Sequence, residues 1–174
     1  MKKLRIYAAR AMSGRIKADV VAEAVTDKAF LERAGFEVLD PVTSEGVEDK
    51  QELLQSSKND MDVFWPRDKQ MIRESHILFH MSPHLNSAGA WQEVGYKRYH
   101  LQGPVVHIYP EGKLPPEGAV PRLENDYVCD SLVDAVEYTL RVHGTFLKRT
   151  IWRLKKLNRC LPRSFWHQLQ EWFK

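Results

Sequence analysis

The sequence predicts a single α/β domain built on a parallel β-sheet, followed by a basic helical extension. Apolar runs of strand length alternate with longer segments of helical period, which is typical of parallel strands joined by crossover helices. A chain of 174 residues is long enough for one well-cored domain and short for two. We therefore expect an α/β domain at 1–143 and a helical tail at 144–174.

Five short segments have the length and apolar content of β-strands. The run 76–81 is almost unbroken in its hydrophobicity, which is typical of a parallel strand covered on both faces. The predicted strands are 4–8, 36–39, 76–81, 104–109 and a short one near 127–128. We expect them to form one parallel sheet of about five strands with helices on both faces.

Helical segments separate these strands. Apolar positions recur at helical spacing after the first loop, and Gly35 follows where a C-terminal cap belongs. Pro66 is expected to open the next helix, because proline fits the first turn, where its missing N–H is not needed. The remaining expected segments are helices at 90–101 and 131–142, a loop with a short helix at 44–58, and an exposed connection at 110–121.

The composition is that of an ordinary globular protein, with 43% hydrophobic and 28% charged residues. No apolar run approaches the roughly 20 residues that a membrane-spanning helix needs. Arg5 and Arg10 interrupt what would be the apolar region of a signal peptide, so a cytoplasmic location is expected.

The cysteines and histidines do not form a recognisable metal-binding or disulfide pattern. Cys129 and Cys160 lie far apart, without CxxC or Cys/His ligand spacing. Three histidines near the expected strand ends likewise lack ligand spacing with acids or cysteines: His80, His84 and His100. We therefore expect neither a metal nor another cofactor.

The C-terminal segment differs from the rest of the chain in charge. Residues 141–174 sum to +8, which leaves −5 for the remainder. Basic and apolar residues alternate over 146–157, and a second helix after Pro162 would place five apolar side chains on one face: Phe165, Trp166, Leu169, Trp172 and Phe173. Such a tail can contact nucleic acid, an anionic membrane surface or an acidic protein, or pack on its own domain or a neighbouring subunit of a homo-oligomer.

Three loops at the C-terminal ends of the strands are expected to form a ligand site, because ligands of open α/β sheets bind at that edge. They are 7–15, 65–68 and 86–93. The first loop contains neither GxGxxG nor a Walker pattern, which disfavours a dinucleotide or a triphosphate. Ser13-Gly14-Arg15 can accept one phosphate, although a plain helix cap would also explain these residues.

Two acids, Asp68 and Glu93, are expected in the first turns of their helices. The helix dipole favours a carboxylate there whatever the function, so spacing alone singles out neither of them.

Five segments resemble, in order and spacing, motifs of the nucleoside 2-deoxyribosyltransferase superfamily. The most specific is 86–96, NSAGAWQEVGY, because the family has a small Gly-containing loop leading into a helix with Glu-Ile/Leu-Gly-Tyr. Segment 68–72, followed by 75–78, is similar to the family's Asp-x-x-x-Ile and the strand after it. The other matching segments are 5–9, 36–41 and 103–106, which are similar to its first, second and Gly-Lys-Pro-Val strands.

The resemblance implies a flavodoxin/Rossmann-like fold and a catalytic role for three residues. Glu93 would be the nucleophile at the anomeric carbon of the sugar, Asp68 would assist at the nucleobase or orient the sugar, and Tyr7 would lie near Glu93. These residue types suit the chemistry, because a carboxylate can stabilise or capture an oxocarbenium-like centre. A second carboxyl can deliver the proton that the departing base needs.

One departure from the family pattern bears on the substrate. Transferases that act on free nucleosides carry an acid six positions before the glutamate, whereas this chain has Ser87, as in the branch that hydrolyses nucleoside 5′-monophosphates. A carboxylate would repel a phosphate and a hydroxyl can donate to it, and Arg10 and Arg15 agree with a phosphate ligand. Ser87 would equally suit an ordinary N-cap. Arg10 also replaces the family's usual Gly-Pro.

Further residues are candidates for contact with the substrate. Trp65 and Trp91 flank the two acids and can stack on a base, although such aromatics are also common in protein cores. The full set of expected substrate-binding residues is Arg10, Met12, Ser13, Gly14, Arg15, Trp65, Ser87, Gly89 and Trp91.

Three hypotheses follow. The first is an enzyme that hydrolyses the N-glycosidic bond of a (deoxy)nucleoside 5′-monophosphate. The second is a 2-deoxyribosyltransferase that exchanges bases between deoxynucleosides. The third is a non-catalytic nucleotide-binding or nucleic-acid-associated protein in which the tail has the main role. The sequence specifies neither the base nor the sugar.

Overall fold

A computed structural model describes residues 3–12, 14–44, 60–85, 87–110, 113 and 126–144. The chain divides into two compact units, Met1–Val136 and Glu137–Lys174, each taken by itself. Several sequence predictions fall wholly or largely outside the described residues: those for Ser13, for the segments 44–58 and 110–121, and for the tail from 145 onward. None of the described helices is long and apolar enough to cross a membrane.

The first unit contains a five-stranded sheet in which every pairing is parallel. Its strands are β1 (Arg5–Ala9), β2 (Glu37–Leu39), β3 (Ile77–His80), β4 (Val105–Ile108) and β5 (Asp126–Cys129). Their order is β2-β1-β3-β4-β5, which is the flavodoxin-like arrangement of a doubly wound sheet. The predicted fold class and all five predicted strands are confirmed, with ends that shift by no more than one residue.

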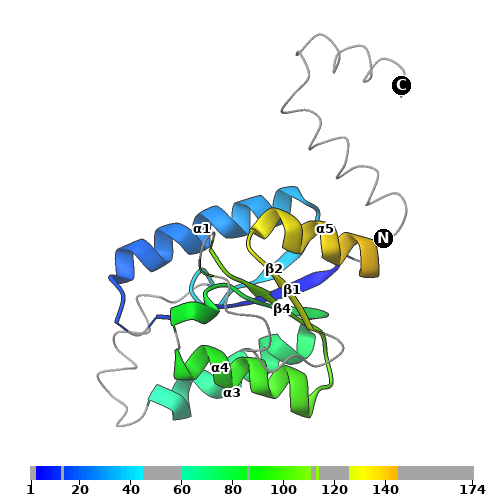
Figure 1. Cartoon of the computed structure of the whole chain (residues 1–174). Helices are drawn as coiled ribbons and strands as arrows, with labels where there is room; N and C mark the ends of the chain where they lie inside the picture. The colour runs from blue at the N-terminus through cyan, green and yellow to red at the C-terminus, as the bar shows by residue number, and fades with distance from the viewer. Residues whose placement is uncertain are drawn as a thin grey trace, which may run out of the picture. The chain divides into compact units, whose positions relative to one another are not determined.

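Helices cover both faces of this sheet, as expected. Figure 1 shows α1 (Lys17–Arg33) on one face and α3 (Asp60–Glu74) with α4 (Ala88–Gly95) on the other. A short 3₁₀ turn, η1 (Pro83–Leu85), precedes α4, and α4 continues directly into a π-helical turn, η2 (Tyr96–His100). The last described helix is α5 (Leu132–His143), and the boundary between the two units falls within it.

The core on the α3/α4 face determines which strand residues reach the candidate site. Side chains of a strand alternate between its two faces, so Tyr7 and Ala9 point toward α3 and α4 while Ile6 and Ala8 point toward α1. The buried cluster on this face contains Tyr7, Ala9, Ile72, Leu78, Val94 and Val105. Burial of each large apolar side chain stabilises the fold by about 1.5–3 kcal/mol, which holds both helices against the sheet.

The end of α1 forms as the sequence predicts. Gly35 has a φ of +96°, a left-handed conformation that glycine adopts without a steric penalty. Its N–H donates to the carbonyl of Glu32 at 3.0 Å, and the N–H of Phe36 donates to the carbonyl of Leu31 at 3.2 Å. These are the two hydrogen bonds of a Schellman motif, and they turn the chain directly into β2.

Two predicted helix starts are wrong, and each changes the place of an acid. α3 begins at Asp60, so Pro66 lies inside the helix instead of opening it. Proline is best tolerated in a first turn but does not require one, and the helix accepts the loss of one backbone hydrogen bond. α4 begins at Ala88, before the predicted start. Asp68 and Glu93 therefore both lie beyond the first turn, and the helix dipole does not explain either carboxyl.

Candidate active site

The centre of the candidate site is a hydrogen bond between β1 and α4. The Tyr7 hydroxyl donates to Glu93 Oε1 at 2.8 Å, although the two residues are 86 positions apart in the sequence. Tyr7 is fully buried, and the alternation of β1 directs its ring toward α4. The structure thus brings together the two residues for which the sequence motifs imply proximity.

Burial raises the pKa of Glu93 to about 8. The hydrogen bond from Tyr7 acts in the opposite direction, while the negative charges of Asp68 and Asp40 raise the pKa further. Burial also raises the pKa of Tyr7 well above its ordinary value, and the neighbouring Glu93 and Asp68 charges add to that effect. Tyr7 therefore stays a hydroxyl donor, and Glu93 carries its proton through much of the neutral range.

Asp68 is presented to this centre by α3. Its Oδ1 accepts hydrogen bonds from Arg67 Nε at 3.2 Å and from Arg67 Nη2 at 2.9 Å. The Asp68 side chain is 13% exposed, and its charge contributes to the raised pKa values of both Tyr7 and Glu93. The Asp68 charge thus acts on both members of the Tyr7–Glu93 pair.

The two tryptophans border the same core cluster. Trp65 and Trp91 are partly buried and pack against the cluster that contains Tyr7. Trp65 meets the ring of Tyr96 edge-on, with 5.6 Å between centroids, and Trp91 meets His80 in the same way at 4.7 Å. Both residues therefore contribute to the packing, and stacking on a nucleobase stays a prediction.

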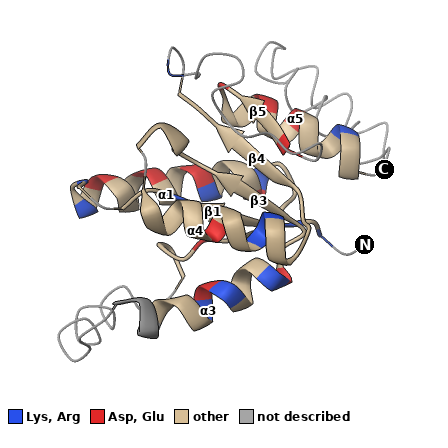
Figure 2. Ribbon diagram, turned by 60° about the horizontal axis from the view of Figure 1, so that its bottom comes forward, with Lys and Arg blue, Asp and Glu red and all other residues tan. Residues whose placement is uncertain are grey.

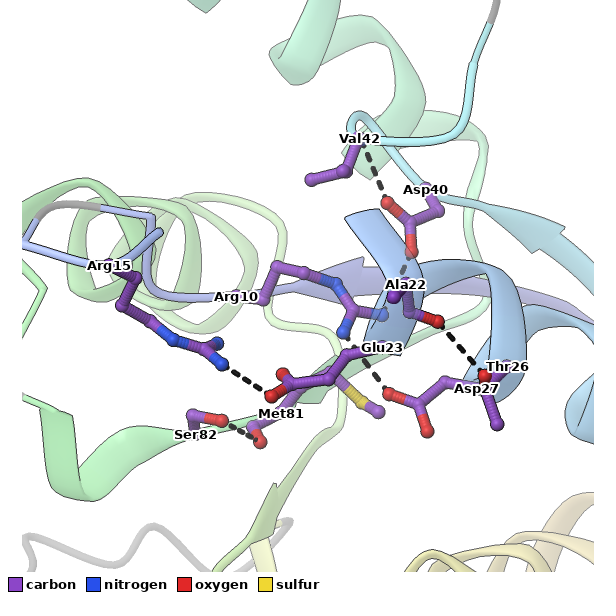
Figure 3. Close-up of polar contacts among 10 residues, drawn as sticks. All are labelled: Arg10, Arg15, Ala22, Glu23, Thr26, Asp27, Asp40, Val42, Met81 and Ser82. Carbon is purple, nitrogen blue, oxygen red and sulfur yellow. Dashed lines mark hydrogen bonds and ion pairs between the residues drawn. The ribbon is translucent and has the colours of Figure 1, made fainter. Parts of the chain in front are cut away.

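Arg10 does not have the place expected of a phosphate ligand. Its side chain is 2% exposed; its Nη2 lies 2.9 Å from Asp40 Oδ2, and its Nη1 lies 3.1 Å from Asp27 Oδ2. Arg10 follows Tyr7 by an odd number of positions, so strand alternation points it to the α1 face, away from Glu93. Figure 3 shows its guanidinium between the two acids. Sequence reasoning missed both partners, although this odd spacing was the available signal.

Arg15, further along the first loop, also turns to α1. Figure 3 shows Arg15 directed toward Glu23, with which it forms an ion pair. Met12 is 44% exposed. Gly14 has a φ of +75°, so the loop turns at a position where most other residues would be strained. Arg15 is thereby engaged by an acid of α1, which weakens the case for this loop as the phosphate site.

Ser87 is the N-cap of α4 by its backbone conformation, but its side chain makes no capping hydrogen bond. It is 8% exposed. Gly89 lies in the first turn of α4, and a Cβ there would meet no atom within 4 Å. The first turn of a helix carries N–H groups without intrahelical partners, and these favour an anion. Ser87 and Gly89 therefore remain suited to a phosphate.

Comparison with protein-family models gives no match to the chain, and comparison with curated proteins gives no significant match. Within the described parts of the chain, no group of three or more His, Cys, Asp or Glu side chains is arranged to hold a metal ion. A functional assignment therefore depends on the geometry around Glu93 together with the resemblance of the sequence motifs.

Proposed function

We propose that this protein hydrolyses the N-glycosidic bond of a (deoxy)nucleoside 5′-monophosphate and releases the free base. The observation that carries the proposal is the hydrogen bond from Tyr7 to Glu93, with the charge of Asp68 close enough to affect both groups. A buried carboxyl oriented by a phenol and accompanied by a second acid suits chemistry at an anomeric carbon.

In the proposed reaction, the Glu93 carboxylate attacks C1′ of the sugar. The C1′–N bond breaks, its electron pair passes to the base nitrogen, and the base takes up a proton. Water then attacks C1′ of the glycosyl ester and the C1′–O bond to Glu93 breaks, which restores the carboxylate and leaves a hydroxyl on the sugar. The proton that the water loses goes to solvent and balances the proton taken up by the base. Tyr7 orients the attacking oxygen, and Asp68, held by two hydrogen bonds from Arg67, orients the sugar or assists at the base.

The protonation state of Glu93 gives this mechanism a direction in pH. A nucleophilic carboxyl must be ionised, and burial raises the pKa of Glu93 to about 8. The value of kcat/KM should therefore rise as the pH approaches about 8 and level off above it. A rate that falls over the same range would mean that Glu93 acts as an acid, which contradicts the nucleophilic role.

The preference for a 5′-monophosphate depends on α4. The absence of a carboxylate at position 87, six positions before Glu93, removes a group that would repel a phosphate. The Ser87 hydroxyl is not used to cap its own helix, and the N-terminus of that helix favours negative charge. Figure 2 shows acidic and basic residues interspersed along α1 and α3.

The test is release of free base, measured by chromatography after incubation with the common deoxynucleoside and ribonucleoside 5′-monophosphates. Wild-type protein should release base, and Glu93→Gln should be slower by at least about a thousandfold. Glu32→Gln, on the exposed side of α1, is the matched control and should retain full activity. Exchange between a deoxynucleoside and a free base, without dependence on a phosphate, would eliminate the hydrolase in favour of a transferase.

A further inference from the structure

A row of buried polar side chains lies beneath α4 and η2. Neighbouring strands place three polar residues on the face that carries Tyr7: His80, His107 and Asp126. His80 is in register with Ala9 of that face, and His107 is in register with His80. Asp126 is in register with Val105, which belongs to the same buried cluster as Tyr7. Arg98 reaches them from η2. His80 is 1% exposed, His107 0% and Arg98 6%, and the Asp126 side chain is 1% exposed. Burial of so many polar groups is costly unless they bind one another.

The contacts within this row fix the position of each proton. Arg98 forms an ion pair with Asp126, and its Nη2 lies 3.2 Å from His107 Nε2. A guanidinium only donates, so with Arg98 as its partner His107 Nε2 accepts and His107 carries its proton on Nδ1. Asp126 Oδ2, 3.9 Å from the same nitrogen, is the group that would favour a proton on Nε2 instead. His107 Nδ1 lies 3.2 Å from His80 Nδ1, which must then accept. His80 is therefore the neutral imidazole with its proton on Nε2.

Trp91 lies at the end of this hydrogen-bond relay. His80 Nε2 is buried and has no nitrogen or oxygen partner. The His80 ring meets the indole of Trp91 at 84° with centroids 4.7 Å apart, and His107 lies 5.7 Å from the same indole. Trp91 precedes Glu93 by two residues in α4 and packs against the cluster of Tyr7. An edge-to-face ring contact of this kind favours one orientation of the indole.

We propose that His80 is a positioning residue: its ring, held by the relay Asp126–Arg98–His107, packs edge-to-face against Trp91 and fixes the indole as the surface on which the nucleobase stacks. The inference rests on the proposed function, because it takes the substrate to carry an aromatic base. It assigns a role to a histidine pair that takes no part in the chemistry at Glu93.

The relay itself can be tested without any substrate. Long-range ¹H–¹⁵N spectra of the labelled full chain distinguish the two neutral imidazole forms. We expect His107 to carry its proton on Nδ1 and His80 on Nε2, and the His80 ring not to titrate between about pH 5.5 and 8.5. Burial lowers the pKa of His80 to about 3, which agrees with the expectation for this ring. A proton on His107 Nε2, or titration of His80 in that range, would overturn the relay.

Two substitutions separate the hydrogen bonds of His80 from the shape of its ring. His80→Phe keeps a ring beside Trp91 but removes the acceptor for His107 and the N–H donor. His80→Asn places a carbonyl near the position of Nδ1 and retains an N–H group. We expect His80→Phe to raise KM by about 2- to 10-fold with kcat changed less than about twofold, and His80→Asn to lie closer to wild type. An unchanged KM in His80→Phe, or an equal effect of both substitutions, would refute the positioning role.

Lys97→Met provides the control for a general loss of stability. Lys97 is buried in η2, and its Nζ donates to the carbonyls of Ile72 and Ser75 at the end of α3, at 3.3 and 2.7 Å. The variant should unfold at a lower temperature and keep the wild-type KM. A KM raised as much as in His80→Phe would mean that the His80 effect is only a loss of stability.

Binding measurements distinguish failure of this inference from failure of the proposed function. Tryptophan fluorescence is titrated with the common deoxynucleoside 5′-monophosphates, for wild type and for His80→Phe. If the wild type releases no base but binds a nucleotide more tightly than His80→Phe does, the role of His80 is supported while the hydrolase is rejected. Equal binding by the two proteins, or binding by neither, would overturn the role of His80.

Discussion

Substitution of Glu93 by glutamine should stabilise the fold, and the stabilisation should increase with pH. Glutamine keeps the shape of a protonated glutamic acid, and its carbonyl can accept the hydrogen bond from Tyr7. Burial raises the pKa of Glu93 from 4.5 to about 8, so between these values the folded protein holds a proton that the unfolded chain has released. The free energy of unfolding of the wild type therefore falls as the pH rises through this window, whereas the variant lacks this contribution.

The magnitude follows from the same two pKa values. Each pH unit between 4.5 and about 8 is worth about 1.4 kcal/mol, which sets an upper bound of about 5 kcal/mol on the difference above pH 8. Glu93 is only partly buried by residue area, and ionisation can be eased by local rearrangement and by water. We therefore expect a gain of about 2–5 kcal/mol at pH 8.5 and almost none near pH 4.5.

The assay is urea unfolding of both proteins across this pH range, followed by circular dichroism. Thermal unfolding provides a second reading, at about 2–4 °C per kcal/mol for a protein of this size. Glu32→Gln, which changes an exposed acid of α1, should show no comparable trend. A difference between Glu93→Gln and wild type that is the same at low and high pH, or a variant that is less stable at high pH, would refute the buried and protonated state of Glu93.

Three further predictions concern residues around this site and its scaffold. Tyr7→Phe removes a hydrogen bond that lowers the pKa of Glu93, so the rise of kcat/KM should move to higher pH; an unmoved profile in the rate assay would contradict the contact. Arg10→Met leaves the fully buried Asp40 carboxylate without its ion pair and should lower the free energy of unfolding in urea by about 3–5 kcal/mol. A much smaller decrease would contradict the ion pair. Gly35→Ala places a Cβ on a residue with φ +96° and should lower the free energy of unfolding by about 1–2 kcal/mol, and a neutral result would argue against the helix cap.

Local patterns in the sequence predict most of the fold. The apolar run 76–81 lies in β3 because a central parallel strand is covered on both faces. Gly35 caps α1 because its left-handed backbone is a local requirement that the glycine itself reveals. Pro66 misleads because its preference for a first turn is only a tendency, and here it lies within α3.

The candidate site is only partly predictable, because its contacts depend on which face and which neighbouring strand a residue reaches. Tyr7 and Glu93 meet as the motifs imply. Arg10 was assigned to the ligand by its charge and its loop, whereas the period of two along β1 sends it to Asp40 on the other face. The relay from Arg98 to His80 requires the register between β3, β4 and β5 and the turn of η2, which spacing along the chain does not reveal.

The nucleophilic role of Glu93 has one direct test, which is to quench the reaction with a deoxynucleoside 5′-monophosphate in acid and map the peptides by mass spectrometry. We predict a sugar phosphate attached to the peptide that contains Glu93, and its loss in Glu93→Gln together with base release. A sugar phosphate found on Asp68, or base release at the wild-type rate by Glu93→Gln, would contradict the proposed reaction.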